Sequence, residues 1–143
     1  MPYKFIEGIT LADVAFEATG KTIEDMFISA GQALTKIQVE NPEIIEPKIA
    51  IKFTVENVDE ERLLHDFLQE LIFYKDAKLL LFCEYKLKIT KLKTGNWKLV
   101  ATIKGEEINQ KKHELLVDAK AVSWHMFEVK KEKDWRCFII IDV

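Results

Sequence analysis

The 143-residue chain has little cysteine and glycine, and each shortage excludes a class of structure or chemistry. Two cysteines, Cys83 and Cys137, are too few for a disulfide framework, and they lack the spacing of a zinc finger. We interpret them as small buried hydrophobic residues in a reducing compartment. With only five glycines and no glycine-rich motif, a phosphate-binding loop is not expected. The sequence also lacks HExxH and GxSxG, the motifs of zinc peptidases and of many serine hydrolases.

Long hydrophobic runs are missing too. None approaches the ~20 residues that span a bilayer, and the N-terminal MPYKFIEGIT lacks the apolar core of a signal peptide. We therefore expect a cytoplasmic protein with no membrane partner. The formal net charge is only -3, which argues against non-specific electrostatic binding of nucleic acid by the whole protein but allows a local basic patch. Strong direct nucleic-acid binding is not expected.

What the chain does have is the composition of a folded globular protein, with 48% hydrophobic and 31% charged residues. Its length matches one ordinary domain, and no repeat or linker interrupts it. We therefore expect a single domain over residues 1–143.

Hydrophobic periodicity predicts two helices, at about residues 22–37 and 59–75. Thr22 and Asp59 stand where a side-chain oxygen can accept a hydrogen bond from a free N–H of the first turn. Each helix has an apolar stripe along one side, so both are expected to cover the face of a sheet.

Clean alternation of apolar and polar residues predicts strands with one buried face at residues 49–56, 83–90 and 97–104. Two later segments, AVSWHMFEV (121–129) and RCFIII (136–141), are apolar on both sides, which predicts central strands. Together the pattern predicts an α+β fold, a two-layer sandwich in which an antiparallel-rich mixed sheet has two helices packed on one face.

Two aspartates lie inside apolar runs, Asp13 in LADVAF and Asp142 in IIIDV. In one interpretation each accepts a backbone hydrogen bond at a strand end, and spacing alone favours this one. In the other, the first and last strands are neighbours, and Asp13, Asp142 and the carboxylate of Val143 converge. Such a group would need a counter-charge, for example Ca²⁺ or Mg²⁺ held by oxygen ligands.

The three histidines are scattered along the chain and predict no catalytic site. We place His65 on the solvated side of its helix and His113 in a polar connection. His125 stands among apolar residues, which favours a hydrogen-bonded core histidine. Ser123 would lie about 7 Å from His125 on the same strand face, too far for direct proton transfer.

Four stretches, in this order, resemble the archease family over essentially the whole chain. The first contains a Thr/Ser-Ala-Asp step, the third a Lys-Ala-(Val/Ile)-Thr/Ser-aromatic-His pattern, and the last a hydrophobic-Asp-hydrophobic end. The stretches are FIEGITLADVAFEATGKT (5–22), LLHDFLQELIFYKD (63–76), VDAKAVSWHMFEV (117–129) and FIIIDV (138–143).

The resemblance implies a small accessory protein, not an enzyme, that serves the RNA-splicing ligase joining tRNA exons. It would promote guanylylation and turnover of that ligase and broaden its nucleotide use. It also implies a divalent metal ion, taken as calcium, bound by Asp13, Asp142 and Val143. An alternative is a chaperone or specificity modulator of RNA-modifying enzymes such as tRNA methyltransferases. A third function, a metal-dependent hydrolase using the same acids, lacks a positioned base.

The chain departs from the family pattern at two places. The usual Glu-His-Thr-Ala-Asp is EGITLAD here, without the histidine and with Leu11 inserted. The usual aromatic-His-Asp end of the second helix is FYKD, with Lys75 in the place of the histidine. Roles of those two histidines are therefore not carried over to this chain.

Overall fold

The computed structural model describes residues 2–7 and 13–143. Within them, eight strands, two α-helices and one short 3₁₀ helix follow one another along the chain. They are β1 (Tyr3–Ile6), β2 (Asp13–Gly20), α1 (Ile23–Gln38), η1 (Pro42–Ile44), β3 (Ile49–Asn57), α2 (Glu60–Lys78), β4 (Leu80–Lys91), β5 (Trp97–Glu107), β6 (Ala121–Val122), β7 (Glu128–Lys131) and β8 (Trp135–Asp142).

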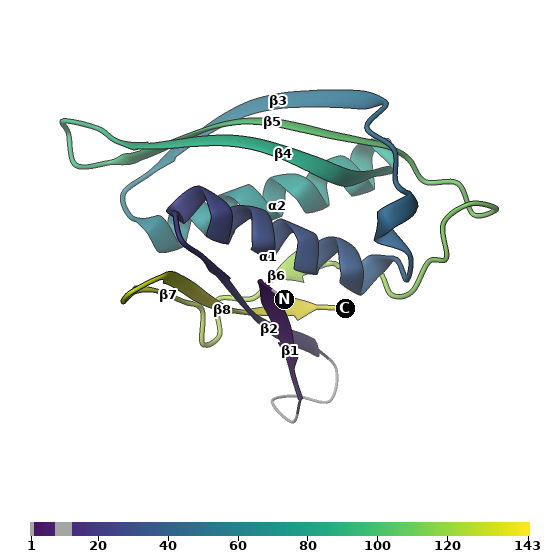
Figure 1. The fold of residues 1–143 in the computed structure, drawn as a ribbon, viewed down its shortest axis with the longest axis horizontal. Helices are drawn as coiled ribbons and strands as arrows, with labels where there is room; N and C mark the ends of the chain where they lie inside the picture. The colour runs from purple at the N-terminus through teal and green to yellow at the C-terminus, as the bar shows by residue number, and fades with distance from the viewer. Residues whose placement is uncertain (1, 8–12) are drawn as a thin grey trace.

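The described strands form two separate sheets. The five-stranded sheet has the order β1-β2-β8-β6, with β7 also paired to β8, and the three-stranded sheet has the order β3-β5-β4. Every pairing is antiparallel. Figure 1 shows α1 and α2 between the two sheets. The α+β class with antiparallel strands and two helices is thus confirmed, but the strands divide into two sheets on opposite sides of the helices.

The division into two sheets follows from how much of α1 is apolar or small. On one side α1 packs against β2 of the five-stranded sheet. On another side Gly31 lies so close to β4 that an added Cβ would be 3.0 Å from the Tyr85 ring. A helix buried on both sides needs two covering layers, and a single sheet supplies one.

Both predicted helix starts are confirmed. Thr22 Oγ1 accepts a hydrogen bond from the Asp25 N–H at 3.1 Å, and Asp59 Oδ1 accepts one from the Arg62 N–H at 2.8 Å. The second helix runs to Lys78, three residues beyond the predicted end, and stops at Leu79 in the left-handed region. No helix among the described residues is both long and apolar enough to cross a bilayer.

The strand predictions are confirmed except for one. β8 lies in the middle of its sheet and is buried on both faces, as predicted for RCFIII. Residues 121–129 do not form one central strand, however. They form β6, an exposed turn in which Met126 has a φ of 56°, and the start of β7. The apolar side chains of this turn fall outside the sheet because Trp124 and Phe127 pack against His65 of α2.

Candidate metal site

The two aspartates predicted to converge stand directly opposite each other. β2 begins at Asp13, β8 ends at Asp142, and the antiparallel register pairs these two residues. Directly opposed residues in such a pair have Cβ atoms roughly 4.5–5.5 Å apart and side chains on the same face. The strand next to the last one is therefore β2, the second strand, whereas the first strand, β1, pairs only with β2 at the edge of the sheet.

Alternation along the strands shows which face this is. Phe16, Ile139 and Ile141 belong to the core beneath the helices. Because successive side chains point to opposite faces, Asp13 and Asp142 point outward, away from the helices. Their carboxylates therefore lie on the outer face of the five-stranded sheet, at one end of it.

The chain terminus lies at the same end. Val143 directly follows Asp142, and its side chain packs against the main core. Figure 1 shows the C-terminus at the end of β8. Val143 thus follows the strand directly beside the opposed pair of Asp13 and Asp142.

The chemistry of these groups fits a hard divalent cation. Like charges directly opposed across a sheet are destabilising, and a cation between the carboxylates removes that repulsion. All the donors are oxygens, which suit Ca²⁺ or Mg²⁺. Among residues 2–7 and 13–143, no group of three or more His, Cys, Asp or Glu could hold a metal ion. A cation between the two aspartates would thus have two side-chain ligands and would need further oxygen ligands from Val143, water or a partner.

Asp142 is held on its other side by the segment that leads into β6. Its carbonyl oxygen accepts a hydrogen bond from the Lys120 N–H at 2.8 Å, and Ala121 pairs with it in the sheet. Asp142 is therefore flanked by Asp13 on β2 and by Ala121 on β6, which fixes its position from both sides.

Lys75 ties this segment to α2. Its side chain is buried, only 6% of the residue being exposed, in the last turn of the helix. Nζ donates to the Ala119 carbonyl at 2.7 Å and forms ion pairs with Asp118 and, at 2.9 Å, with Asp76. Lys75 was missed as a site residue, yet its spacing from Leu71 places it on the buried stripe of the helix, where a lysine needs partners.

Two more side chains of α2 hold the next residue of this segment. Gln69 Oε1 accepts from the Val122 N–H at 2.6 Å, and His65 Nε2 lies 2.9 Å from the Val122 carbonyl. The His65 ring stacks on Trp124 with centroids 3.9 Å apart. The prediction of a solvated His65 is therefore wrong. So is the prediction of a core His125, which lies exposed in the turn.

His113 lies in the connection after β5, as predicted, and its side chain is buried there. Its Nδ1 accepts the Asn109 N–H at 2.9 Å, so the ring proton is on Nε2, 3.2 Å from Glu106 Oε2. Burial alone would raise the pKa of Glu106, but hydrogen bonds from Lys112, the Glu46 N–H and His113 lower it to about 2. The cluster anchors the loop after β5 and lies outside the metal site.

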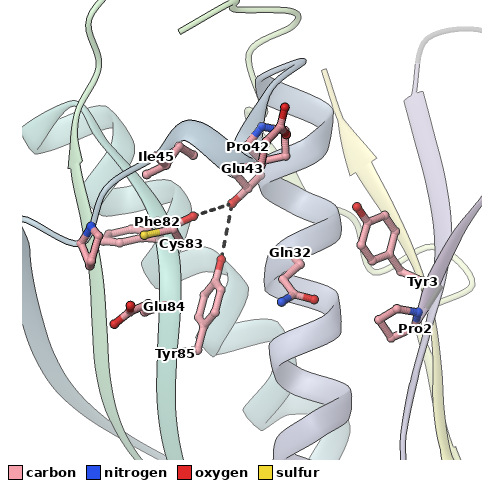
Figure 2. Close-up of a pocket in the computed structure, with 12 residues that line it drawn as sticks. Pro2, Tyr3, Gln32, Pro42, Glu43, Ile45, Phe82, Cys83, Glu84 and Tyr85 are labelled. Atoms are coloured by element: carbon pink, nitrogen blue, oxygen red, sulfur yellow. Dashed lines mark hydrogen bonds between the residues drawn. The ribbon is translucent and has the colours of Figure 1, made fainter. Parts of the chain in front are cut away.

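A cavity of about 500 Å³ lies between α1, β4, the N-terminal strand and the η1 segment (Figure 2). The Thr35 hydroxyl lies 3.4 Å from the Tyr85 hydroxyl and 3.5 Å from the Phe82 carbonyl oxygen. Burial raises the pKa of Tyr85 and that of Cys83, so both stay protonated at neutral pH. Neither group is therefore an activated nucleophile.

The comparisons with known proteins concern the family and the fold of the chain. The model of the Archease protein family matches residues 3–143. Protein archease of Thermococcus kodakarensis is 35% identical over 125 residues, which are 87% of each chain. The solution structure of Methanobacterium thermoautotrophicum protein 1598 has a TM-score of 0.85 and 30% identity, and the match covers 99% of each chain.

A crystal structure described as an archease, possible chaperone, from Thermotoga maritima has a TM-score of 0.62 at 18% identity. It covers 94% of this chain and 93% of that one, and at this identity the likeness shows the fold alone. Two helices between two antiparallel sheets thus define a small α+β protein with the archease fold. This chain belongs to the archease family, as its four sequence stretches indicated. The inserted Leu11 lies outside the described residues.

Proposed function

We propose that this chain activates an RNA-splicing ligase by presenting a divalent-ion site, and that it has no catalytic activity of its own. The observation that carries the proposal is the direct pairing of Asp13 with Asp142, with Val143 next to Asp142 in the chain. Family membership supports it, because the resemblance that led to the family implies this partner and these ligands.

In this proposal the residues of the chain have separate tasks. Asp13, Asp142 and the Val143 carboxylate hold the ion at the outer end of the five-stranded sheet. Lys75 and the Lys120 N–H hold Asp142 in register. When bound, the divalent ion supplies a positive centre that oxygen ligands of a partner can share. Because the paired carboxylates lie on an outward face, an ion held there would be accessible to oxygen ligands of the ligase.

The proposal is tested by guanylylation of the purified ligase under single-turnover and multiple-turnover conditions. We expect Asp13→Asn and Asp142→Asn to lose the stimulation by at least about tenfold, because each removes a charged ligand. Glu17→Gln is the matched control, since Glu17 lies on the same face of β2 and pairs with Lys4 instead. Full stimulation by both aspartate variants would exclude this role for the pair.

A specific observation also favours the alternative of a chaperone for RNA-modifying enzymes. Leu115, Leu116 and Val117 form a run of apolar residues that are each at least 40% exposed. Exposed apolar runs of this kind are typical of surfaces that bind other proteins. If the chain protects an RNA methyltransferase from thermal aggregation, replacing this run with serines should remove the protection and leave ligase stimulation intact.

A further inference from the structure

The outer face of the three-stranded sheet carries a cluster of lysines. The alternate residues of β3, β4 and β5 that face the helices are apolar and belong to the core. Those that face outward include five lysines and two glutamates, in a chain whose net charge is -3. The lysines, which we call the lysine face, are Lys52, Lys86, Lys88, Lys98 and Lys104.

The register brings these lysines into one compact area. Lys52 of β3 and Lys86 of β4 stand on either side of Thr102 of β5 in one cross-strand row. Lys104 lies in the next row and Lys88 two residues further along β4. Neighbouring strands are about 4.8 Å apart and alternate residues about 6.7 Å apart, so the ammonium groups of long side chains can reach a common ligand.

No intramolecular ion pair neutralises the lysine face in the part of the chain that the structure describes. The ion pairs there involve other basic residues, and the cation–π contacts use Lys78, Lys91 and Lys131. The two glutamates on this face, Glu56 and Glu84, only partly offset its charge. The face is therefore positive although the whole chain is acidic.

A hollow of about 450 Å³ lies within this area. The short side chains of Ala50 and Thr102 lie among Lys52, Lys86 and Lys104 in its lining, which also includes Glu84 and Tyr85. A phosphate group entering the hollow would meet three lysines and the Thr102 hydroxyl against a single carboxylate, that of Glu84. Lysine ammonium groups bind phosphate as point charges.

The composition of the face favours nucleic acid over a membrane. A membrane-binding surface combines basic residues with large apolar side chains that enter the lipid, whereas the only large apolar residue exposed on these three strands is Val100. The face carries no aromatic ring on which a base could stack, which predicts contacts to the phosphate backbone without sequence readout. It also lies on the opposite side of the helices from Asp13 and Asp142 (Figure 1).

We propose that the lysine face binds the phosphate backbone of RNA without regard to sequence. The choice of RNA among nucleic acids rests on the proposed function, but the binding needs no ligase and no metal ion. This surface therefore adds a second, independent contact to a protein whose metal site faces the other way.

The test is fluorescence anisotropy of a labelled RNA hairpin titrated with the full chain in EDTA at several salt concentrations. At low salt we expect a dissociation constant on the order of 10⁻⁵ M, with the logarithm of affinity falling by about 3 to 4.5 per decade of salt. The triple variant Lys86→Gln, Lys88→Gln, Lys104→Gln should bind at least about tenfold more weakly. The slope of the logarithm of its affinity against the logarithm of salt concentration should be shallower by about 2 to 3.

The matched control is Lys21→Gln, Lys111→Gln, Lys133→Gln, which removes the same charge from exposed lysines outside this face. It should bind within about twofold of the wild type. Three results would overturn the proposal: no binding by the wild type at low salt, equal losses in both triple variants, or equal binding to anionic lipid vesicles. None depends on ligase stimulation, so the proposed function can fail or stand separately.

Discussion

At the scale of single residues, the structure shows why two charged groups are buried outside the proposed metal site. Lys75 is surrounded by acceptors from the segment it holds, and Glu106 by donors from the loops it anchors. Buried charged groups are tolerated only when such partners compensate for lost water. Each therefore stabilises a particular arrangement of loops.

Replacing Lys75 should weaken the metal site without contacting the ion. Lys75→Met removes the donor to the Ala119 carbonyl, which leaves a buried acceptor unpaired and costs about 1–3 kcal/mol of unfolding free energy. It also loosens the segment bonded to Asp142, so calcium affinity should fall about tenfold. Urea unfolding and calorimetric calcium titration measure the two effects. Lys78→Met, at an exposed position in the same helical turn, should cost at most about 1 kcal/mol through its contact with the Tyr74 ring and should leave calcium affinity unchanged.

Stability at acid pH should depend on Glu106. The pKa of its carboxyl is about 2 in the folded chain and near 4.5 when unfolded, so its stabilising contribution is complete above about pH 4.5. The contribution is lost as the pH falls from 4.5 towards 2. Thermal unfolding should show that Glu106→Gln loses less stability over this range than the wild type or the exposed-site variant Glu107→Gln. If the stability of Glu106→Gln and that of the wild type fell in parallel with pH, the low pKa assigned to Glu106 would be contradicted.

At the scale of elements, the pairing of β4 with β5 contains a β-bulge, and the residue opposite the bulge, Gly105, has no room for a side chain. The register shifts between Phe82 and Glu84, opposite Gly105. A Cβ added to Gly105 would lie 1.8 Å from the Leu81 carbonyl oxygen. That contact is with backbone, so no rotamer change relieves it and the strands would have to move apart.

Gly105→Ala should therefore destabilise the fold by about 3 kcal/mol or more, because overpacking against backbone falls at the upper end of such costs. Gly95→Ala gives the comparison, since Gly95 has a positive φ of 94° but no atom within 4 Å of an added Cβ. It should cost about 1 kcal/mol. Equal unfolding midpoints in urea for the two variants would show that the bulge is not constrained as described.

The elements differ in how well the sequence predicts them. Both helices and their caps were predictable because the apolar stripe and the capping residues are local signals. The second sheet was not, because a helix buried on two sides gives the same kind of stripe as one buried on a single side. The break between β6 and β7 was missed because Trp124 is apolar yet packs on His65 outside the sheet.

The aspartates of the candidate site could be found from the sequence, but their arrangement in space could not. Asp13 and Asp142 could be found as acids inside apolar runs, but their convergence depends on which strands pair, and spacing does not determine pairing. Their partner segment, held by Lys75, lies more than forty residues from that lysine along the chain. Contacts over such separations leave no local pattern in a sequence.

At the scale of the whole molecule, the fold places the paired aspartates and the lysine face on opposite sides of the helices. The helices lie between a sheet whose outer face carries Asp13 and Asp142 and a sheet whose outer face carries five lysines (Figure 1). The net charge of the whole chain, -3, does not indicate that five lysines share one face. If both proposals hold, one face presents a divalent ion to a protein partner while the other is free to contact RNA.

The central claim is that Asp13, Asp142 and the carboxylate of Val143 bind one divalent ion together. It is tested most directly by titrating the protein with Ca²⁺ and following the backbone amides by NMR. We expect saturable shifts confined to Asp13, Asp142, Val143 and the neighbouring Lys120 and Ala121, and their loss in Asp13→Asn and Asp142→Asn alike. If these amides do not move, or if either variant titrates like the wild type, the shared site does not exist.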